Sequence, residues 1–273
     1  MKIKTSTISG IIANETNRMT PIPTQQLFED LYVIQDSFAN IFLIKDNKKF
    51  IAIDAGINPD QIKQELTKLG ISADDVKTVL LTHSDIDHVN GLSAFNKAEI
   101  YLPKAEVAML NKFRITMTET DFNAATQAYS DLNQDESMFG DDDYWPQDDM
   151  QITNHSPHQL ISFMKNKINQ SFKTIDDGEK LHFDQTSIEA VLIAGHTKGL
   201  TSYIVNQKYI FVSDGLSLQN GYVAPFNKFL TLDQEQHRKS ISKIKNLKGF
   251  DYIFTQHYGY TGNIAKAFEN WLD

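Results

Sequence analysis

The fold of this chain is decided by the segment Thr82-His83-Ser84-Asp85-Ile86-Asp87-His88. It directly follows the apolar run 76–81, which is typical of a buried strand. Two imidazoles and two carboxylates within six residues are ligands that divalent metal ions accept. The alternative is a polar loop whose histidines merely cap a helix.

Three further polar residues follow predicted strands later in the chain. His196 lies in Ala-Gly-His-Thr-Lys-Gly, Asp214 in Val-Ser-Asp-Gly and His257 in Gln-His-Tyr-Gly, each after an apolar run. Side chains at strand ends are held rigidly, and neighbouring glycines allow close backbone approach. A single histidine at a strand end is more often an ordinary hydrogen-bonded residue, so it is their joint order that indicates a metal site.

These residues make the chain resemble the metallo-β-lactamase-fold superfamily of metallohydrolases, in particular its glyoxalase II-like and lactonase-like members. The family motif H-x-H-x-D-H corresponds to residues 83–88, and the histidine of its G-H-T-x-G motif corresponds to His196. Its bridging aspartate corresponds to Asp214 and its last histidine to His257. The early strand that ends in Asp54-Ala55-Gly56 also matches.

The resemblance covers about residues 30–110 and 175–273. It implies an α/β fold, a four-layer αββα sandwich within a single domain (1–273), with a dinuclear metal site at one edge. It also implies a metal-bridging hydroxide as the nucleophile. Asp87 would orient this hydroxide, and Asp54 would fix the motif loop by hydrogen bonds. The ligands would be His83, Asp85, His196 and Asp214 for one ion, and Asp87, His88, Asp214 and His257 for the other.

The chain departs from the family pattern at Asp85, where the family usually has histidine. A carboxylate still binds metal, but it makes the first position harder and more anionic. We therefore expect two divalent ions, with zinc as the first expectation and iron or manganese as alternatives because of Asp85. The other interpretation is that Asp85 points away and leaves the first position weak or empty.

The remaining sequence predicts strands and helices in the order of two packed sheets with helices outside. Residues 31–54 predict a hairpin meander, and Asn58-Pro59-Asp60 begins a predicted helix. The polar region 111–172, with interleaved aromatic and Met residues, predicts a mostly helical insertion that is either a lid over the metal cleft or a dimer arm. Further strands are expected at 76–81, 99–102, 180–183, 187–193, 202–205, 209–212 and 252–255, and helices at 104–110, 232–244 and 265–272.

The composition excludes several classes of protein. The 273 residues include no cysteine, which rules out disulfides and thiolate metal sites. The net charge of −9 argues against nucleic acid or an anionic membrane as the main partner. Eight acidic residues and no Lys or Arg lie in 131–149, so the excess of negative charge is concentrated in the insertion. If the insertion is a lid, we expect it to disfavour highly anionic substrates. With no apolar stretch near the roughly 20 residues of a membrane span, we expect a cytoplasmic protein, with a homodimer through the insertion as one option.

The predicted function is a dinuclear metal-dependent hydrolase acting on a small-molecule ester, thioester or lactone. The alternatives are a phosphodiesterase of the same fold and a non-catalytic metal-binding or sensing module. Tyr258 directly follows a predicted ligand, so its hydroxyl is a candidate to stabilise an oxyanion, although aromatic residues there more often serve packing. Weaker candidates are Tyr222, Tyr260 and Lys198 for substrate contact, and His155 and His158, which are interpreted as an exposed pair rather than a third metal site.

Overall fold

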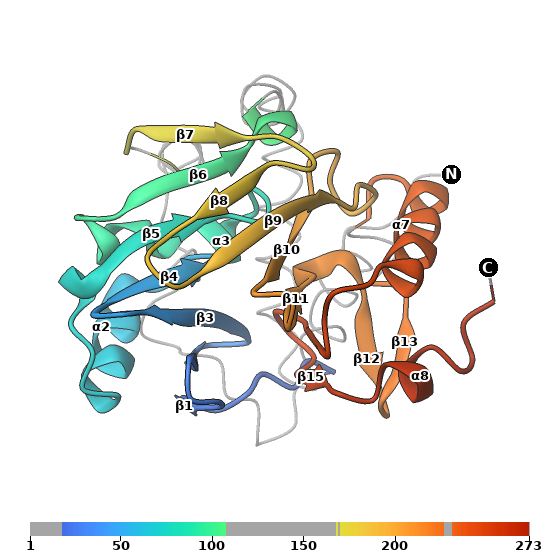
Figure 1. Ribbon diagram of the computed structural model, residues 1–273, viewed down its shortest axis with the longest axis horizontal. Coiled ribbons are helices and arrows are strands. Elements are labelled where there is room, and N and C mark those ends of the chain that lie inside the picture. Colours follow the sequence, from blue (N-terminus) through green and yellow to red (C-terminus); the bar gives the residue numbers. More distant parts are fainter. Residues whose placement is uncertain (1–17, 108–167, 169, 227–230, 273) are drawn as a thin grey trace, which may run out of the picture. The chain divides into compact units, whose positions relative to one another are not determined.

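The computed structural model describes residues 18–107, 168, 170–226 and 231–272 (Figure 1). The chain forms two compact units, and the unit made of 19–110 and 168–273 contains nearly all of these residues. The other unit, 1–18 and 111–167, lies outside the described residues apart from Arg18. The predicted insertion and the pair His155 and His158 therefore fall largely or wholly outside the description.

The first sheet has seven strands in sequence order, β1 to β7. Its first part is an antiparallel meander of β1, β2, β3 and β4, which confirms the hairpins predicted over 31–54. From β4 to β7 the strands are parallel. The strands are β1 (Gln25–Gln26), β2 (Leu31–Asp36), β3 (Ala39–Asp46), β4 (Lys49–Ile53), β5 (Val76–Leu80), β6 (Glu99–Pro103) and β7 (Phe172–Ile175).

The second sheet has six strands in the order β15-β14-β11-β10-β9-β8. Only the pair β11 and β14 is parallel, and the helix α7 (Gln234–Asn246) lies between them in the chain. A separate hairpin of β12 (Ser217–Gln219) and β13 (Tyr222–Ala224) follows β11. The other strands are β8 (Lys180–His182), β9 (Ser187–Leu192), β10 (Thr201–Val205), β11 (Tyr209–Phe211), β14 (Tyr252–Phe254) and β15 (Tyr260–Thr261).

Three apolar clusters divide the unit into layers. Strand β3 shows the arrangement, because alternate residues point to opposite faces of a sheet. Phe42 packs in the cluster between the two sheets together with Phe211 and Phe254 of the second sheet. Ile41, on the opposite face of β3, packs in a second cluster together with α2 (Pro59–Lys68). The third cluster packs α7 against the second sheet. The order helix, sheet, sheet, helix confirms the predicted αββα sandwich (Figure 1).

The helix α2 forms where the sequence predicts it. Asn58 caps its first turn, with the side-chain oxygen accepting from the backbone nitrogens of Asp60 and Gln61 at 3.0 and 3.1 Å. Ile62 and Leu66, one turn apart, are buried against the first sheet. This crossover joins the parallel strands β4 and β5 and so brings the predicted metal-binding segment to the end of β5.

The predicted closing helix over 265–272 is wrong in extent, because α8 spans only Ile264–Ala267. The chain leaves the helix there and buries Trp271 against α7, where its indole nitrogen donates to Ser242 Oγ at 3.0 Å. Lys245 and Arg238 of α7 donate to the backbone carbonyls of Trp271 and Leu272. Tertiary contacts thus replace the last helical turns.

No helix in the described part of the chain is long and apolar enough to cross a membrane.

Candidate metal centre

The predicted ligands lie where strands of both sheets end. His83 and Asp85 follow β5, and the short helix α3 (Ile86–Val89) carries Asp87 and His88. His196 follows β9, while Asp214 and His257 follow β11 and β14. Because β11 and β14 are parallel neighbours, their carboxyl ends meet at one edge of the sheet. The structure brings all seven predicted side chains together there.

His83, Asp85 and His196 form the first ligand group, with their ligand atoms within 4.8 Å of one another. Asp85 Oδ2 lies 3.2 Å from His196 Nε2 and 3.6 Å from His83 Nε2. Asp214 adds its Oδ2 atom, which lies 3.4 Å from His196 Nε2 and 3.8 Å from His83 Nε2. The side chain of Asp85 therefore points into the group, as expected of a ligand.

Asp87, His88 and His257 form the second ligand group. Asp87 Oδ2 lies 3.4 Å from His257 Nε2 and 3.6 Å from His88 Nε2. The other oxygen of Asp214, Oδ1, lies 3.2 Å from His257 Nε2 and 3.7 Å from His88 Nε2. One carboxylate thus faces both groups, with one oxygen for each.

The donor atoms fit a pair of divalent ions. Four ligands at about 2.0–2.1 Å from zinc stand about 3.3–3.4 Å apart, close to the separations found here. Nε2 of His83, His88 and His257 and Oδ1 of Asp214 are buried and have no hydrogen-bond partner among the described residues. Buried polar atoms normally have partners, so four that converge without one are atoms suited to metal binding.

The electrostatics of the metal-free cluster favour uptake of cations. Burial lowers the pKa of His88, but the carboxylates of Asp87, Asp54 and Asp214 outweigh it and hold that pKa well above its usual value. Burial raises the pKa of Asp214, but His257 and His88 more than reverse this and keep it ionised. Against the effect of burial, the acidic side chains likewise raise the pKa of His196 and His257, so these three histidines favour the protonated form until a metal ion displaces the proton.

Asp54 supports the ligands from behind, as the sequence predicts. This fully buried carboxylate accepts from the backbone nitrogen of Thr82 at 2.7 Å, from Thr82 Oγ1 at 2.8 Å, and faces His88 Nδ1 at 3.0 Å. The backbone of Asp54 and of Ser213 has a positive φ, 63° and 51°, which is uncommon outside glycine. Ser213 Oγ lies 3.0 Å from Thr82 Oγ1, so Asp54 and Ser213 belong to one polar network below the ligands.

Three of the four histidines have a partner that fixes the ring. Nδ1 faces Thr82 Oγ1 at 3.0 Å in His83 and the Phe38 carbonyl oxygen at 2.9 Å in His257, in addition to the Asp54 contact of His88. A partner on Nδ1 leaves Nε2 free for metal. In His196, Nδ1 is buried without such a partner among the described residues.

Aromatic rings flank the histidines. The ring of Phe226 meets the ring of His196 edge-on at 5.0 Å and lies 6.0 Å from that of His257. The ring of Phe38 lies 5.8 Å from the ring of His257. Neither aromatic residue was recognised from the sequence, since neither belongs to a motif. Their apolar surfaces border the polar cluster.

The weaker candidates lie in different surroundings. Tyr258 is only 5% exposed and packs in the cluster of the second sheet, with its ring 6.4 Å from that of His257. Its predicted oxyanion role stays a prediction. Tyr260 stacks on Phe254, and Lys198 is exposed. The ring of Tyr222 faces the Lys266 amine rather than a ligand.

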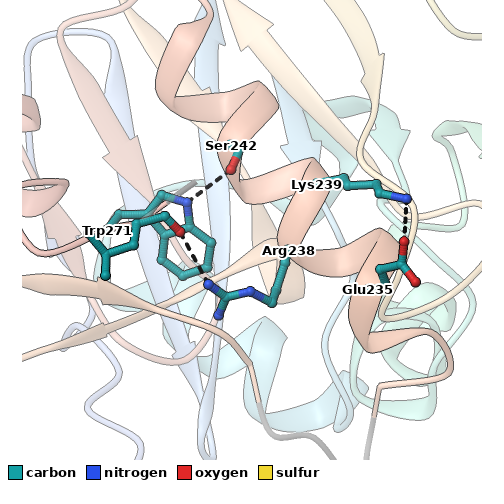
Figure 2. Close-up of a pocket in the computed structure, with 6 residues that line it drawn as sticks. Glu235, Arg238, Lys239, Ser242 and Trp271 are labelled. Carbon is teal, nitrogen blue, oxygen red and sulfur yellow. Dashed lines mark hydrogen bonds and ion pairs between the residues drawn. The ribbon is translucent and has the colours of Figure 1, made fainter.

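A cavity of about 380 Å³ lies elsewhere, between α7 and the last residues of the chain (Figure 2). Its charges are partnered within it: Lys239 pairs with Glu235 at 2.6 Å, and Arg238 donates to the carbonyl of Leu272 at 3.2 Å. None of the seven predicted ligands lines it. The metal-binding cluster, rather than this cavity, is the candidate site.

The chain belongs to the metallo-β-lactamase superfamily, whose model matches residues 34–257. This is a superfamily of metal-dependent hydrolases, and the clustered histidines and aspartates agree with divalent metal binding. A search of curated proteins gave no match.

Solved structures show the same fold at low sequence identity. A metallo-beta-lactamase family protein of Thermus thermophilus is 19% identical with a TM-score of 0.60, over 89% of this chain and 78% of that one. A subclass B3 metallo-beta-lactamase of Bradyrhizobium japonicum is 18% identical with a TM-score of 0.54, over 88% of this chain and 79% of that one. A B3 metallo-beta-lactamase described as having an active-site glutamic acid is 19% identical with a TM-score of 0.57, over 94% and 90%.

Proposed function

We propose that this chain is a hydrolase that works with two divalent metal ions. The observation that carries the proposal is the carboxylate of Asp214, whose Oδ2 faces one ligand group and whose Oδ1 faces the other. A carboxylate in this position suits a bridge between two ions. His83, Asp85 and His196 would hold the first ion, and Asp87, His88 and His257 the second.

Two bound ions would lower the pKa of water to near neutrality and polarise the substrate oxygen. The remaining roles fall to the chain itself. Asp87 is the proposed proton acceptor, because its Oδ2 faces the second ligand group, 3.6 Å from His88 Nε2 and 3.4 Å from His257 Nε2. Its pKa is lowered, which keeps the side chain in the ionised form that can accept a proton. Burial raises that pKa, but His88 and His257 more than offset the effect, so the carboxylate is ionised and available. Asp54 and Thr82 would keep the ligand rings in place.

The proposed substrate is a small-molecule ester, thioester or lactone. The three carboxylates Asp85, Asp87 and Asp214, two divalent ions and one hydroxide sum to about zero charge, which suits an uncharged acyl group. The aromatic rings of Phe38 and Phe226 beside the histidines provide apolar surface for it. A phosphodiesterase is the second candidate, and a sensing module is disfavoured because all seven ligand residues converge.

Asp85 bears on the choice of metal. Zinc is the first expectation, and a carboxylate in place of the usual histidine shifts preference toward iron or manganese. A similar structure is described as a metallo-beta-lactamase with an active-site glutamic acid, so an acidic side chain is compatible with this fold. We also propose a cytoplasmic location, which cell fractionation tests, and a homodimer through 111–172, which a measurement of molecular mass in solution tests.

The test combines metal analysis with a substrate panel. Protein purified without added metal should carry about two equivalents of metal per chain, and should hydrolyse an ester, thioester or lactone faster than a phosphodiester or a β-lactam. Asp214→Asn should lower kcat by at least about 100-fold, because both ions lose a shared ligand. Asp46→Asn is the matched control, because Asp46 is a buried carboxylate outside the cluster.

Two results would contradict the proposal. Protein that binds no divalent metal after loading and dialysis would support the sensing or binding module instead. Activity of the Asp214→Asn variant equal to that of the parent would rule out a mechanism that depends on both ions.

A further inference from the structure

Glu106 is a fully buried acidic side chain that the proposed mechanism does not use. It lies in the helical residues 104–107, directly after β6. No Lys, Arg or His forms an ion pair with it in the part of the chain that the structure describes. A buried carboxylate without a cation is unfavourable unless hydrogen bonds satisfy it. Its partners therefore indicate what it does.

Both oxygens of Glu106 accept hydrogen bonds from two separate loops. Oε2 accepts from the backbone nitrogen of Ser84 at 3.1 Å and from Ser84 Oγ at 2.6 Å. Oε1 accepts from Thr197 Oγ1 at 2.6 Å and from the backbone nitrogen of Gly199 at 2.9 Å. Ser84 lies between His83 and Asp85, and Thr197 directly follows His196. Glu106 thus joins the two loops that carry the first ligand group.

These loops carry Asp85 and His196, the two ligands with the least support of their own, besides His83, which has Thr82 as its Nδ1 partner. Of the four ligand histidines, His196 is the one whose buried Nδ1 has no hydrogen-bond partner among the described residues. Asp85 has the more exposed side chain of the two acids in its segment, 46% against 19% for Asp87. By contrast, His88 and His257 of the second group have Nδ1 partners in Asp54 and Phe38. Asp85 and His196, which directly adjoin the partners of Glu106, are therefore the ligands that depend most on external support.

Gly199 shows how closely the second loop approaches Glu106. A Cβ atom added at this glycine would lie 2.6 Å from the backbone nitrogen of Glu106 and 2.7 Å from its Oε1. Both separations are shorter than van der Waals contact allows. A residue with a side chain would push the loop away and lengthen the hydrogen bond from Gly199, so the sequence at 199 agrees with a tight link.

We propose that Glu106 is a positioning residue that holds His83, Asp85 and His196 in the geometry the first metal ion requires. The inference rests on the proposed metal centre and deepens it. The carboxylate does not touch the ion or the substrate. It acts through Ser84, Thr197 and Gly199, and it leaves the second ligand group to Asp54 and Phe38.

The first experiment measures zinc binding by Glu106→Gln. Glutamine keeps the shape but has one acceptor oxygen, so one of the two loops loses the acceptor of both its hydrogen bonds. Loss of such a supporting contact typically weakens metal binding by about 10- to 100-fold. We expect this weakening for one of two zinc ions, measured by chelator competition on metal-free protein, with the other affinity changed by less than about twofold.

Asp46→Asn is the matched control. Asp46 is also buried, and its two oxygens accept from the backbone nitrogens of Asp184 and Gln185 at 3.0 and 2.7 Å. These contacts do not involve the ligand loops. The control should lose one buried hydrogen bond of the same kind, from a backbone nitrogen to a carboxylate oxygen, and keep both zinc affinities. Weakening of both ions to the same degree in both variants would mean that Glu106 only stabilises the fold.

Double variants assign the weakened ion. In an Asp85→Asn background, the first position is already impaired, so Glu106→Gln should add less than about a twofold loss. In a His257→Ala background, which impairs the second position, Glu106→Gln should retain its full effect. The reverse pattern would overturn the assignment to the first group.

The outcomes separate the inference from the proposed function. If the parent protein binds neither zinc nor manganese nor iron, the metal centre itself is wrong. If the parent binds two ions and Glu106→Gln binds both as tightly, only the role of Glu106 is wrong. Should Glu106→Gln fail to fold, Ser84→Ala and Thr197→Val each remove one hydroxyl donor. They should weaken the same ion by smaller factors, and unchanged affinities in both would refute the inference.

Discussion

At the scale of single residues, the site depends on which atom of each side chain is occupied. The supporting contacts of Thr82, Asp54 and Phe38 are on Nδ1, so Nε2 of three histidines is left without a partner and faces the aspartates. Asp214 divides its two oxygens between the ligand groups. The residue types alone do not fix these choices, because an imidazole binds metal through either nitrogen.

Asp85→His tests the role of the unusual ligand. An imidazole is a softer donor than a carboxylate, so the variant should raise the ratio of zinc to manganese affinity by at least about tenfold. Competition between the two metals, followed by elemental analysis, measures the ratio. Asp75→His, at an acidic residue outside the cluster, should leave it unchanged. An unchanged ratio in Asp85→His would show that this side chain does not bind the ion.

At the scale of elements, α7 connects the metal-binding edge to the second sheet. His237 of α7 is buried, and its Nε2 accepts from the backbone nitrogen of Phe226 at 3.2 Å. Phe226 in turn contacts the ring of His196. A Cβ atom at Gly195 would lie 2.3 Å from the Cα of His237, so the loop that carries His196 packs directly on the helix. The helix thus helps to place both an aromatic neighbour and a ligand loop.

Stability should depend on pH through His237. Burial, and then the nearby His196, lower its pKa to about 4, below the usual value of 6.5. The unfolded chain therefore takes up the proton first as pH falls. The contribution of His237 to the free energy of unfolding is fully present above about pH 6.5 and declines between pH 6.5 and 4. It amounts to about 3 kcal/mol in total.

Urea unfolding at pH 7.5 and pH 5, with chelator present, measures this effect. His237→Gln keeps an acceptor for Phe226 but does not titrate. The free energy of unfolding of the parent should fall by about 2 kcal/mol more than that of the variant between the two pH values. Parallel changes in both proteins would show that His237 is not the group responsible.

At the scale of the whole molecule, the two sheets bring together ligands from distant parts of the chain. The first sheet supplies residues 83–88, and the second supplies His196, Asp214 and His257. The cluster that contains Phe42 and Phe211 holds the sheets face to face. Metal ions bound between these segments would add links between the sheets.

Metal binding should therefore stabilise the fold as a whole. An ion that binds only the native state adds about 2.7 kcal/mol at a free concentration 100 times its Kd. The midpoint of thermal unfolding should rise with zinc and return after chelation. Asp214→Asn should show a smaller rise, whereas Asp46→Asn should keep the full one. Equal midpoints with and without zinc in the parent would contradict metal binding by the native state.

The sequence predicted much of this architecture because its signals are local. Alternating or continuous apolar runs gave most strands of both sheets, and Asn58-Pro59 gave the start of α2. The prediction missed β1, β12, β13 and β15, whose two or three residues are too short to show a period. It also missed β7, which has four residues and begins at the end of the region assigned to the insertion. It extended α8 to residue 272, because helical spacing there did not reveal the contacts of Trp271 with α7.

The sequence by itself determined which residues serve as candidate ligands, because the motif at 83–88 and the strand-end histidines and aspartate are visible as patterns. The family resemblance implied their division into two groups that share Asp214, but only the tertiary structure decided which atoms of these side chains face one another. It alone revealed Glu106, which is 22 residues from Ser84 and 91 from Thr197 in the chain. The physical reason is that hydrogen bonds between distant segments depend on the packing of two sheets, and no local pattern in the sequence records that packing.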